Sequence, residues 1–83
     1  MNKQKNMLIV DDDPDYLFQM KMAVKEMGFE VITADTQKEA ETIIEKTRPD
    51  LAILDLMMEQ QDTGFILCHK LKNRYPDIPI IIV

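Results

Sequence analysis

Four short apolar runs alternate with longer amphipathic segments along the chain. The runs cover residues 7–10, 31–34, 51–54 and 80–83. Apolar runs of this length, separated by segments of helical length, are typical of a βαβ series around a parallel sheet. Three of the runs are continuously apolar, as strands covered on both faces are. The run Val31-Ile32-Thr33-Ala34 is mixed, so we expect it at an edge of the sheet.

Three helices are predicted between these strands. The first begins with Asp13 as its N-cap and Pro14 at its first helical position, and it ends near Gly28. The second begins at Thr36, which has capping-box spacing to Glu39, and the third follows the glycine at position 64. The predicted element order is therefore β-α-β-α-β-α-β.

Apolar residues lie on two sides of the first predicted helix. The expected core-facing stripe consists of positions three and four residues apart: Leu17, Met20, Val24 and Met27. Phe18 and Met22 fall roughly 100° or more around the helix axis from this stripe. We therefore expect these two side chains to contact another element or to be exposed.

Composition limits the chain to one small acidic domain. Among 83 residues, 10 Lys and Arg face 15 Asp and Glu, which gives a net charge of −5 and argues against a nucleic-acid or anionic-membrane surface. A single Cys excludes an internal disulfide and indicates a reducing compartment. The apolar runs are too short for a secretory signal or a membrane span. We expect a soluble, cytoplasmic protein with a polar tail over residues 1–6 and one domain over residues 7–83.

Aspartates gather where two of the predicted strands end. Helix capping accounts for Asp13, but it leaves Asp11 and Asp12 after the first strand, and Asp55 after the third. In an open α/β sheet of order 2-1-3-4-5, ligands bind beyond the carboxyl ends of strands 1 and 3, so these three carboxylates should converge there. Their mutual repulsion calls for a hard cation such as Mg²⁺. Asp55 is then a candidate nucleophile for a phosphoryl group.

Four motifs stand at characteristic spacing: LIVDDDP (8–14), RPDLAILDLMM (48–58), GF (64–65) and IPIIIV (78–83). Together they closely resemble the receiver domain of two-component response regulators, and the resemblance extends from residue 7 to residue 83. It implies a flavodoxin-like, doubly wound parallel sheet of order 2-1-3-4(-5) in a signal-transduction protein.

The resemblance also implies the roles of the site residues. Asp55 would accept a phosphoryl group from a histidine kinase or histidine phosphotransfer protein of a phosphorelay. Asp12 would bind Mg²⁺ directly, Asp11 would bind it through water, and Met57 would contribute its backbone carbonyl. The protein would be a signalling phosphoacceptor that assists its own phosphorylation and dephosphorylation, rather than an enzyme. It would signal to an output domain or a partner.

The sequence departs from the family pattern in two ways. Glu59 stands where the family usually has Pro, and Gly64 follows Asp55 by nine residues where the family has eight. The family's phosphoryl-reading Thr or Ser, its Lys, its fifth strand and its last two helices would all follow Val83. We therefore expect these residues to be the front of a longer receiver domain, and to be phosphorylated weakly or not at all on their own.

Two other functions are compatible with parts of this pattern. A degenerate receiver that binds partners without phosphorylation is favoured by Glu59, but the acidic triad opposes it. An aspartyl-phosphate hydrolase is the other alternative. The pattern of such enzymes has a second Asp two residues after the nucleophile, and this chain has Met57 there. If the natural chain ends at Val83, we expect self-association through the uncharged strand at residues 80–83 or through Phe18 and Met22.

Overall fold

The computed structural model describes residues 5–55, 58 and 62–83, and its strands form a single parallel sheet. The strands are β1 (Asn6–Val10), β2 (Glu30–Ala34), β3 (Leu51–Leu54) and β4 (Ile80–Ile82). Their order is β2-β1-β3-β4, which confirms the predicted fold class and the position of the mixed run at an edge.

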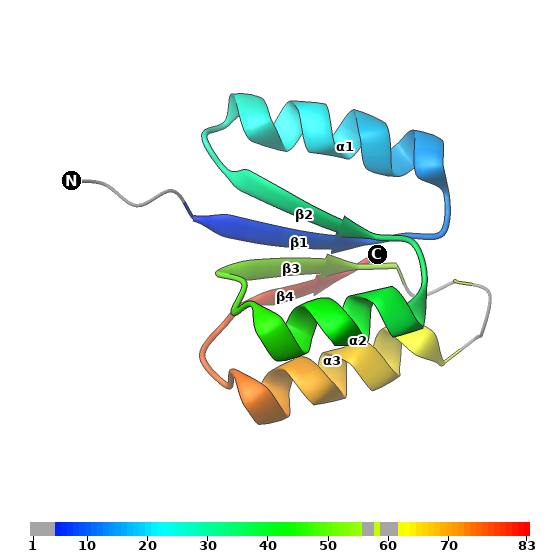
Figure 1. Ribbon diagram of the computed structural model, residues 1–83, viewed down its shortest axis with the longest axis vertical. Coiled ribbons are helices and arrows are strands. Elements are labelled where there is room, and N and C mark those ends of the chain that lie inside the picture. The colour runs from blue at the N-terminus through cyan, green and yellow to red at the C-terminus, as the bar shows by residue number, and fades with distance from the viewer. Residues whose placement is uncertain (1–4, 56–57, 59–61) are drawn as a thin grey trace.

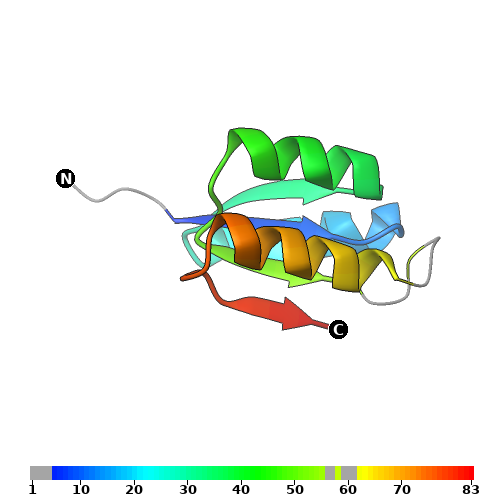
Figure 2. The same cartoon turned by 90° about the horizontal axis from the view of Figure 1, so that it is seen from below.

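Three helices cover the two faces of this sheet. They are α1 (Pro14–Glu26), α2 (Gln37–Lys46) and α3 (Thr63–Arg74). Helix α1 lies on one face, whereas α2 and α3 lie side by side on the other (Figure 1; Figure 2). One face of the sheet therefore has less helical cover than the other.

The strand register aligns the carboxyl ends of the three strands on the β2 side of the sheet. Val10 of β1 pairs with Ala34 of β2 and with Leu54 of β3. The residues that follow these three positions therefore lie together beyond the carboxyl ends of the strands.

The core has two layers because successive strand residues point to opposite faces. The layer toward α2 and α3 is the larger, and its buried residues include Leu8, Val10, Ala52, Leu54, Leu67, Leu71 and Ile78. The layer toward α1 contains Met7, Ile9, Leu17 and Val24. The apolar runs thus supply both layers from the same strands.

Helix α1 begins as predicted, but its apolar stripe is shorter than expected. The Asp13 carboxylate accepts hydrogen bonds from the backbone N–H groups of Asp15 and Tyr16, which confirms the N-cap. Met27 is 70% exposed, so its assignment to the core stripe was wrong. The helix ends at Glu26, and Gly28 has a φ of 97° that turns the chain away.

The two apolar side chains outside the α1 stripe are exposed. Phe18 is 64% exposed and Met22 is 57% exposed, in agreement with their predicted place off the stripe. Phe18 also lines a shallow hollow with Lys21 of α1 and Thr33 of β2. Phe18 therefore lies toward the β2 edge of the sheet.

Helix α3 begins at Thr63, two residues earlier than a helix that follows Gly64 would begin. Thr63 and Gly64 are both helical and buried, so the expectation that the helix follows Gly64 was wrong. The Thr63 hydroxyl donates a hydrogen bond to the side-chain carbonyl of Gln37 on α2, at 3.2 Å. This contact satisfies a buried polar group and lets the first turn of α3 pack against α2.

No helix in the described part of the chain is long and apolar enough to cross a membrane.

Candidate acidic site at the carboxyl ends of the strands

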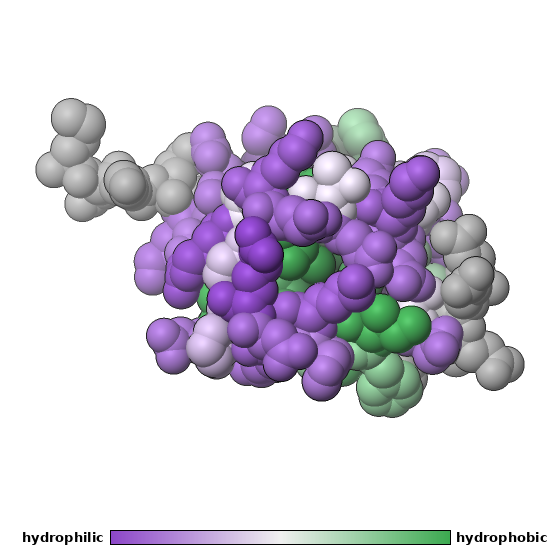
Figure 3. Space-filling view, turned by 60° about the horizontal axis from the view of Figure 1, so that its bottom comes forward, coloured by the Kyte–Doolittle hydropathy of each residue, from purple (hydrophilic) through white to green (hydrophobic). Residues whose placement is uncertain are grey.

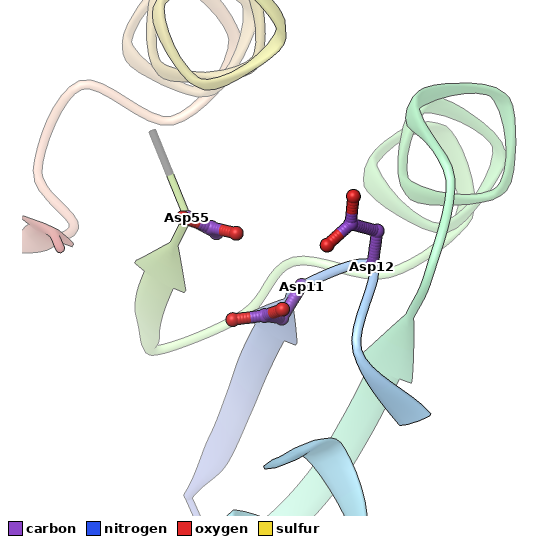
Figure 4. Close-up of side chains that lie close together, drawn as sticks. All are labelled: Asp11, Asp12 and Asp55. Carbon is purple, nitrogen blue, oxygen red and sulfur yellow. The ribbon is translucent and has the colours of Figure 1, made fainter. Parts of the chain in front are cut away.

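Three carboxylates meet beyond the ends of β1 and β3. One carboxylate oxygen from each of Asp11, Asp12 and Asp55 lies within 4.8 Å of the others (Figure 4). Asp11 and Asp55 are half-buried and Asp12 is exposed. The structure therefore brings together the three side chains that the strand order predicted to converge.

The sheet itself fixes two of these aspartates. The backbone N–H of Asp11 donates to the carbonyl of Ala34 at 3.1 Å, and that of Asp55 donates to the carbonyl of Val10 at 2.9 Å. These bonds continue the parallel ladders one residue beyond the strands. The Cα positions of Asp11 and Asp55 are consequently set by three neighbouring strands rather than by a loop.

The next aspartate orients the first. The backbone N–H of Asp13 donates to a carboxylate oxygen of Asp11 at 2.9 Å, while the Asp13 side chain caps α1. Asp13 thereby holds Asp11 through its backbone. An aspartate two residues before an N-cap is a sequence signal for such a turn.

The electrostatics of the cluster disfavour a further negative charge. Burial raises the pKa of the Asp11 carboxyl above its ordinary value of 3.8, and the negative charges of Asp55, Asp12 and Asp13 raise that pKa further. The hydrogen bond from the Asp13 N–H acts in the opposite direction and lowers it. A cation among these oxygens would offset the repulsion.

The donor set suits a hard divalent cation. Carboxylate oxygens are ligands that Mg²⁺ uses in proteins, and Mg²⁺ keeps several waters beside one or two carboxylates. Asp12 is exposed, so water can reach the cluster. Water oxygens and carboxylate oxygens could therefore bind one cation together. The predicted fourth ligand, the backbone carbonyl of Met57, lies outside the described residues, as does Glu59.

A chain of polar contacts that no sequence pattern predicted connects α2 to α3. Thr63 bonds to Gln37, Gln37 donates to Glu41 at 3.1 Å, and Lys70 pairs with Glu41 at 3.1 Å. The hydrogen bond from Gln37 and the charge of Lys70 hold the pKa of Glu41 below its ordinary value. These contacts join α2 to α3.

A second concave region lies between α2 and α3. This open hollow of about 680 Å³ is lined by Glu41, Ile44, Glu45, Lys70, Asn73 and Arg74. Figure 3 views this side of the molecule and shows hydrophobic atoms framed by hydrophilic side chains. Arg74 donates to the backbone carbonyl of Glu45, and Lys70 pairs with Glu41, so the cations in the hollow are engaged within the chain.

The fold and the acidic cluster define a receiver domain of a two-component response regulator. The family model described as the response regulator receiver domain matches residues 7–83, so the chain belongs to this family. Among curated proteins, the chain is 40% identical over 76 residues to the heme response regulator HssR of Staphylococcus aureus (strain MRSA252). That match covers 92% of this chain and 33% of HssR, so the chain spans about a third of the length of this relative.

Solved structures show the same fold. The response regulator TrrA of Thermotoga maritima, solved in complex with Mg(2+)-BeF, is 30% identical with a TM-score of 0.86, over 95% of this chain and 68% of TrrA. A CheY-like receiver domain protein of Methanospirillum hungatei JF-1 is 31% identical with a TM-score of 0.90, over 96% of this chain and 63% of that protein. These similarities confirm the family and the fold predicted from the motifs.

Proposed function

We propose that this receiver domain accepts a phosphoryl group on Asp55, with Mg²⁺ held by Asp11, Asp12 and Asp55. The observation that carries the proposal is the convergence of the three carboxylates within 4.8 Å at the ends of β1 and β3. The donor would be a phosphohistidine of a histidine kinase or a histidine phosphotransfer protein. Mg²⁺ would neutralise the charge of the phosphoryl oxygens.

The reaction on this chain is a nucleophilic substitution at phosphorus. A carboxylate oxygen of Asp55 forms a bond to phosphorus while the phosphorus–nitrogen bond of the donor breaks, and the histidine side chain leaves. The product is an aspartyl phosphate, and attack by water on phosphorus later restores the carboxylate. The ladder bond from the Asp55 N–H to Val10 holds the nucleophile in place during the transfer.

The metal ligands have different proposed roles. Asp12 would bind the ion directly, Asp11 would bind it through water, and the Met57 carbonyl would complete the protein ligands. The Asp13 N–H, which donates to Asp11, would keep the Asp11 carboxylate oriented toward the cluster. The similarity to TrrA, which was solved with Mg(2+)-BeF, supports a Mg²⁺ site here.

The wider role follows from the length of the relatives. The chain spans about a third of HssR, so we propose that a longer parent protein carries an output domain and acts in the cytoplasm. There the phosphorylation state of Asp55 would be passed to that domain or to a partner, and the domain would act as a signalling phosphoacceptor rather than as an enzyme.

Phosphorylation is tested by incubating the chain with a small-molecule phosphodonor and Mg²⁺ and measuring the intact mass. We expect a small fraction of the chain to gain one phosphoryl group, and we expect no gain in Asp55→Asn or after chelation of the metal. Asp35→Asn is the matched control, because Asp35 follows β2 at the same edge but is not in the cluster. An adduct that persists in Asp55→Asn would contradict the proposal.

Metal binding is tested separately by calorimetric titration with Mg²⁺. We expect binding that Asp12→Asn weakens by at least tenfold and that Asp35→Asn leaves unchanged. A chain that neither binds Mg²⁺ nor gains a phosphoryl group would instead support the degenerate receiver, which acts as a phosphorylation-independent interaction module.

A further inference from the structure

Strand β2 forms the edge of the sheet opposite to β4 (Figure 1). Among the described strands only β1 pairs with β2, so the other side of β2 has no strand beside it. The three middle residues of β2, which are Val31, Ile32 and Thr33, are half-buried. An edge strand of this kind can accept an added strand from another chain.

The hydrogen bonds to β1 show which backbone groups of β2 point outward. The N–H of Glu30 and the carbonyl of Ala34 are both bonded to residues that flank β1. Residues 30 and 34 thus face β1, and residue 32 faces it too because the bonding direction alternates along a strand. The N–H and C=O groups of Val31 and Thr33 consequently point away from the sheet, toward the open edge.

A hollow lies beside this edge on the α1 face of the sheet. Its volume is about 250 Å³, and it is lined by Thr33 of β2 and by Pro14, Leu17, Phe18 and Lys21 of α1. Three of these four α1 side chains are apolar, and Phe18 is exposed. A strand that pairs with Thr33 would place the side chain opposite Thr33 at this hollow. The edge thus combines outward backbone groups with a pocket for a side chain, which are the two parts of a strand-binding site.

We propose that β2 binds an extended segment of a partner protein as an added antiparallel strand. Antiparallel pairing is slightly more stable per residue than parallel pairing. One residue of the segment lies opposite Thr33, the residue two positions later lies opposite Val31, and each pair exchanges two N–H···O=C bonds. The residue opposite Thr33 is apolar, since its side chain meets Leu17 and Phe18 in the hollow.

The charge at one end of the edge specifies a further residue of the partner. Glu30 is exposed and lies opposite the residue that follows the one facing Val31. Glu30 and that residue form a non-hydrogen-bonded pair, with Cα atoms roughly 4.5 Å apart, so a lysine or arginine there meets the Glu30 carboxylate. The net charge of −5 also favours a cationic partner, and it disfavours a second copy of this chain as the occupant.

The probe is a capped, fluorescently labelled peptide, Ser-Thr-Leu-Thr-Val-Lys, whose Leu is placed to face Thr33 and whose Lys is placed to face Glu30. Fluorescence anisotropy measures its binding to the 83-residue chain without Mg²⁺ or a phosphodonor, so the result is independent of the proposed function. The contact is smaller than the roughly 1,200 Å² of standard interfaces, so we expect weak but saturable binding. In the proton–nitrogen NMR spectrum of the chain, the amides of Val31 and Thr33 should shift most.

Matched peptides test the backbone pairing. N-methylation of the peptide Leu or Val removes an N–H that faces β2, so either change should abolish binding. N-methylation of the Thr between them removes an N–H that faces away from β2, so binding should be retained. Three results would overturn the proposal: no saturable binding, equal losses from all three methylations, or the largest NMR shifts at the β4 edge.

Two variants of the chain test the side-chain contacts. Phe18→Ser should weaken binding of the Leu peptide by about fivefold, and it should leave binding of the same peptide with Ala in place of Leu nearly unchanged. Glu30→Lys should weaken binding of the Lys peptide by about two- to fivefold and strengthen binding of the same peptide with Glu in place of Lys.

Both substituted residues are exposed, so circular dichroism should show that the two variants are folded. An equal loss of the Leu and Ala peptides in Phe18→Ser would overturn the assignment of the hollow. A Glu30→Lys chain that still prefers the Lys peptide would overturn the assignment of the charged end.

Discussion

Aspartates follow three neighbouring strands at one edge of the sheet, but their surroundings give them different chemistry. Asp35 follows β2 as Asp11 follows β1 and Asp55 follows β3. Only the last two share the described cluster with Asp12. The Asp35 backbone N–H instead donates to the Glu39 carboxylate at the start of α2. All three residues are aspartates, so residue type does not explain their different roles. The roles differ because Asp11 and Asp55 follow adjacent inner strands, whereas Asp35 follows the edge strand β2.

The stability of the chain should respond to Mg²⁺ through this cluster. A ligand that binds the folded state alone stabilises it by mass action, so Mg²⁺ should raise the melting temperature and a chelator should reverse the effect. Asp12→Asn should lose most of the Mg²⁺-dependent increase, whereas Asp35→Asn should retain it. Thermal unfolding followed by circular dichroism measures both. An equal increase in the two variants would contradict the site.

Glu41 should make stability depend on pH in the acidic range. The hydrogen bond from Gln37 and the charge of Lys70 hold the pKa of Glu41 below its ordinary value of 4.5. Its contribution to the free energy of unfolding is therefore present above pH 4.5 and is lost as the pH falls through the lower, folded-state pKa. At neutral pH, Glu41→Gln should lower that free energy by less than about 1 kcal/mol, because the pair is partly exposed.

Urea unfolding at several pH values measures this effect. The difference between the wild type and Glu41→Gln should shrink toward zero as the pH falls below the folded-state pKa. Lys70→Met removes the ion pair and leaves the Gln37 hydrogen bond, so it should cause part of the same loss. A difference that stays constant down to strongly acidic pH would assign the effect to packing instead.

At the scale of the elements, helix ends were more predictable from the sequence than helix faces. The caps at Asp13 and Thr36 depend on side chains that bond to nearby backbone groups, so the local sequence is sufficient to predict them. Burial of Met27 depended on how far α1 continues over the sheet, and the helix ends one residue before it. The start of α3 was an exception among the helix ends, because it depended on Gln37, which is 26 residues away from Thr63.

The cap of α2 offers a test with an internal control. The Thr36 hydroxyl accepts a hydrogen bond from the Glu39 N–H at 3.1 Å, and Thr36→Ala should lower the free energy of unfolding by about 1 kcal/mol. Thr42, inside the same helix, donates to the carbonyl of Lys38 and caps nothing. Thr42→Ala should be neutral or slightly stabilising, because Ala has the higher helix propensity. Equal losses in urea unfolding would contradict the capping role.

At the scale of the whole molecule, the sequence was sufficient for the topology and the family, but not for the surface between the helices. Alternating apolar runs and helical segments restrict a chain to few arrangements, and the predicted order β2-β1-β3-β4 is confirmed. The hollow between α2 and α3 depends on contacts such as Arg74 with the Glu45 carbonyl. No periodicity in the sequence specifies such contacts.

The larger core layer should carry most of the stability of the molecule. Leu67 on α3 is completely buried in that layer, so Leu67→Ala should lower the free energy of unfolding by about 2–5 kcal/mol. Phe65 lies two residues earlier on the same helix and is 60% exposed. Phe65→Ala should cost less than about 1 kcal/mol. Chemical denaturation compares the two variants, and similar losses would show that α3 packs differently.

Because the ends of β1 and β3 are aligned, the acidic cluster forms only when these strands pair in their native register. Val10 pairs with Leu54, and Asp55 comes next in the chain. A slip of one residue would shift Asp55 along the sheet by about 3.3 Å and turn its side chain to the opposite face. A misregistered sheet would therefore lack the three-carboxylate cluster, even with every strand present. A folding intermediate with a slipped β3 would be compact but unable to bind Mg²⁺ at this cluster. The time course of Mg²⁺ binding during refolding would therefore report when the strands reach their native register.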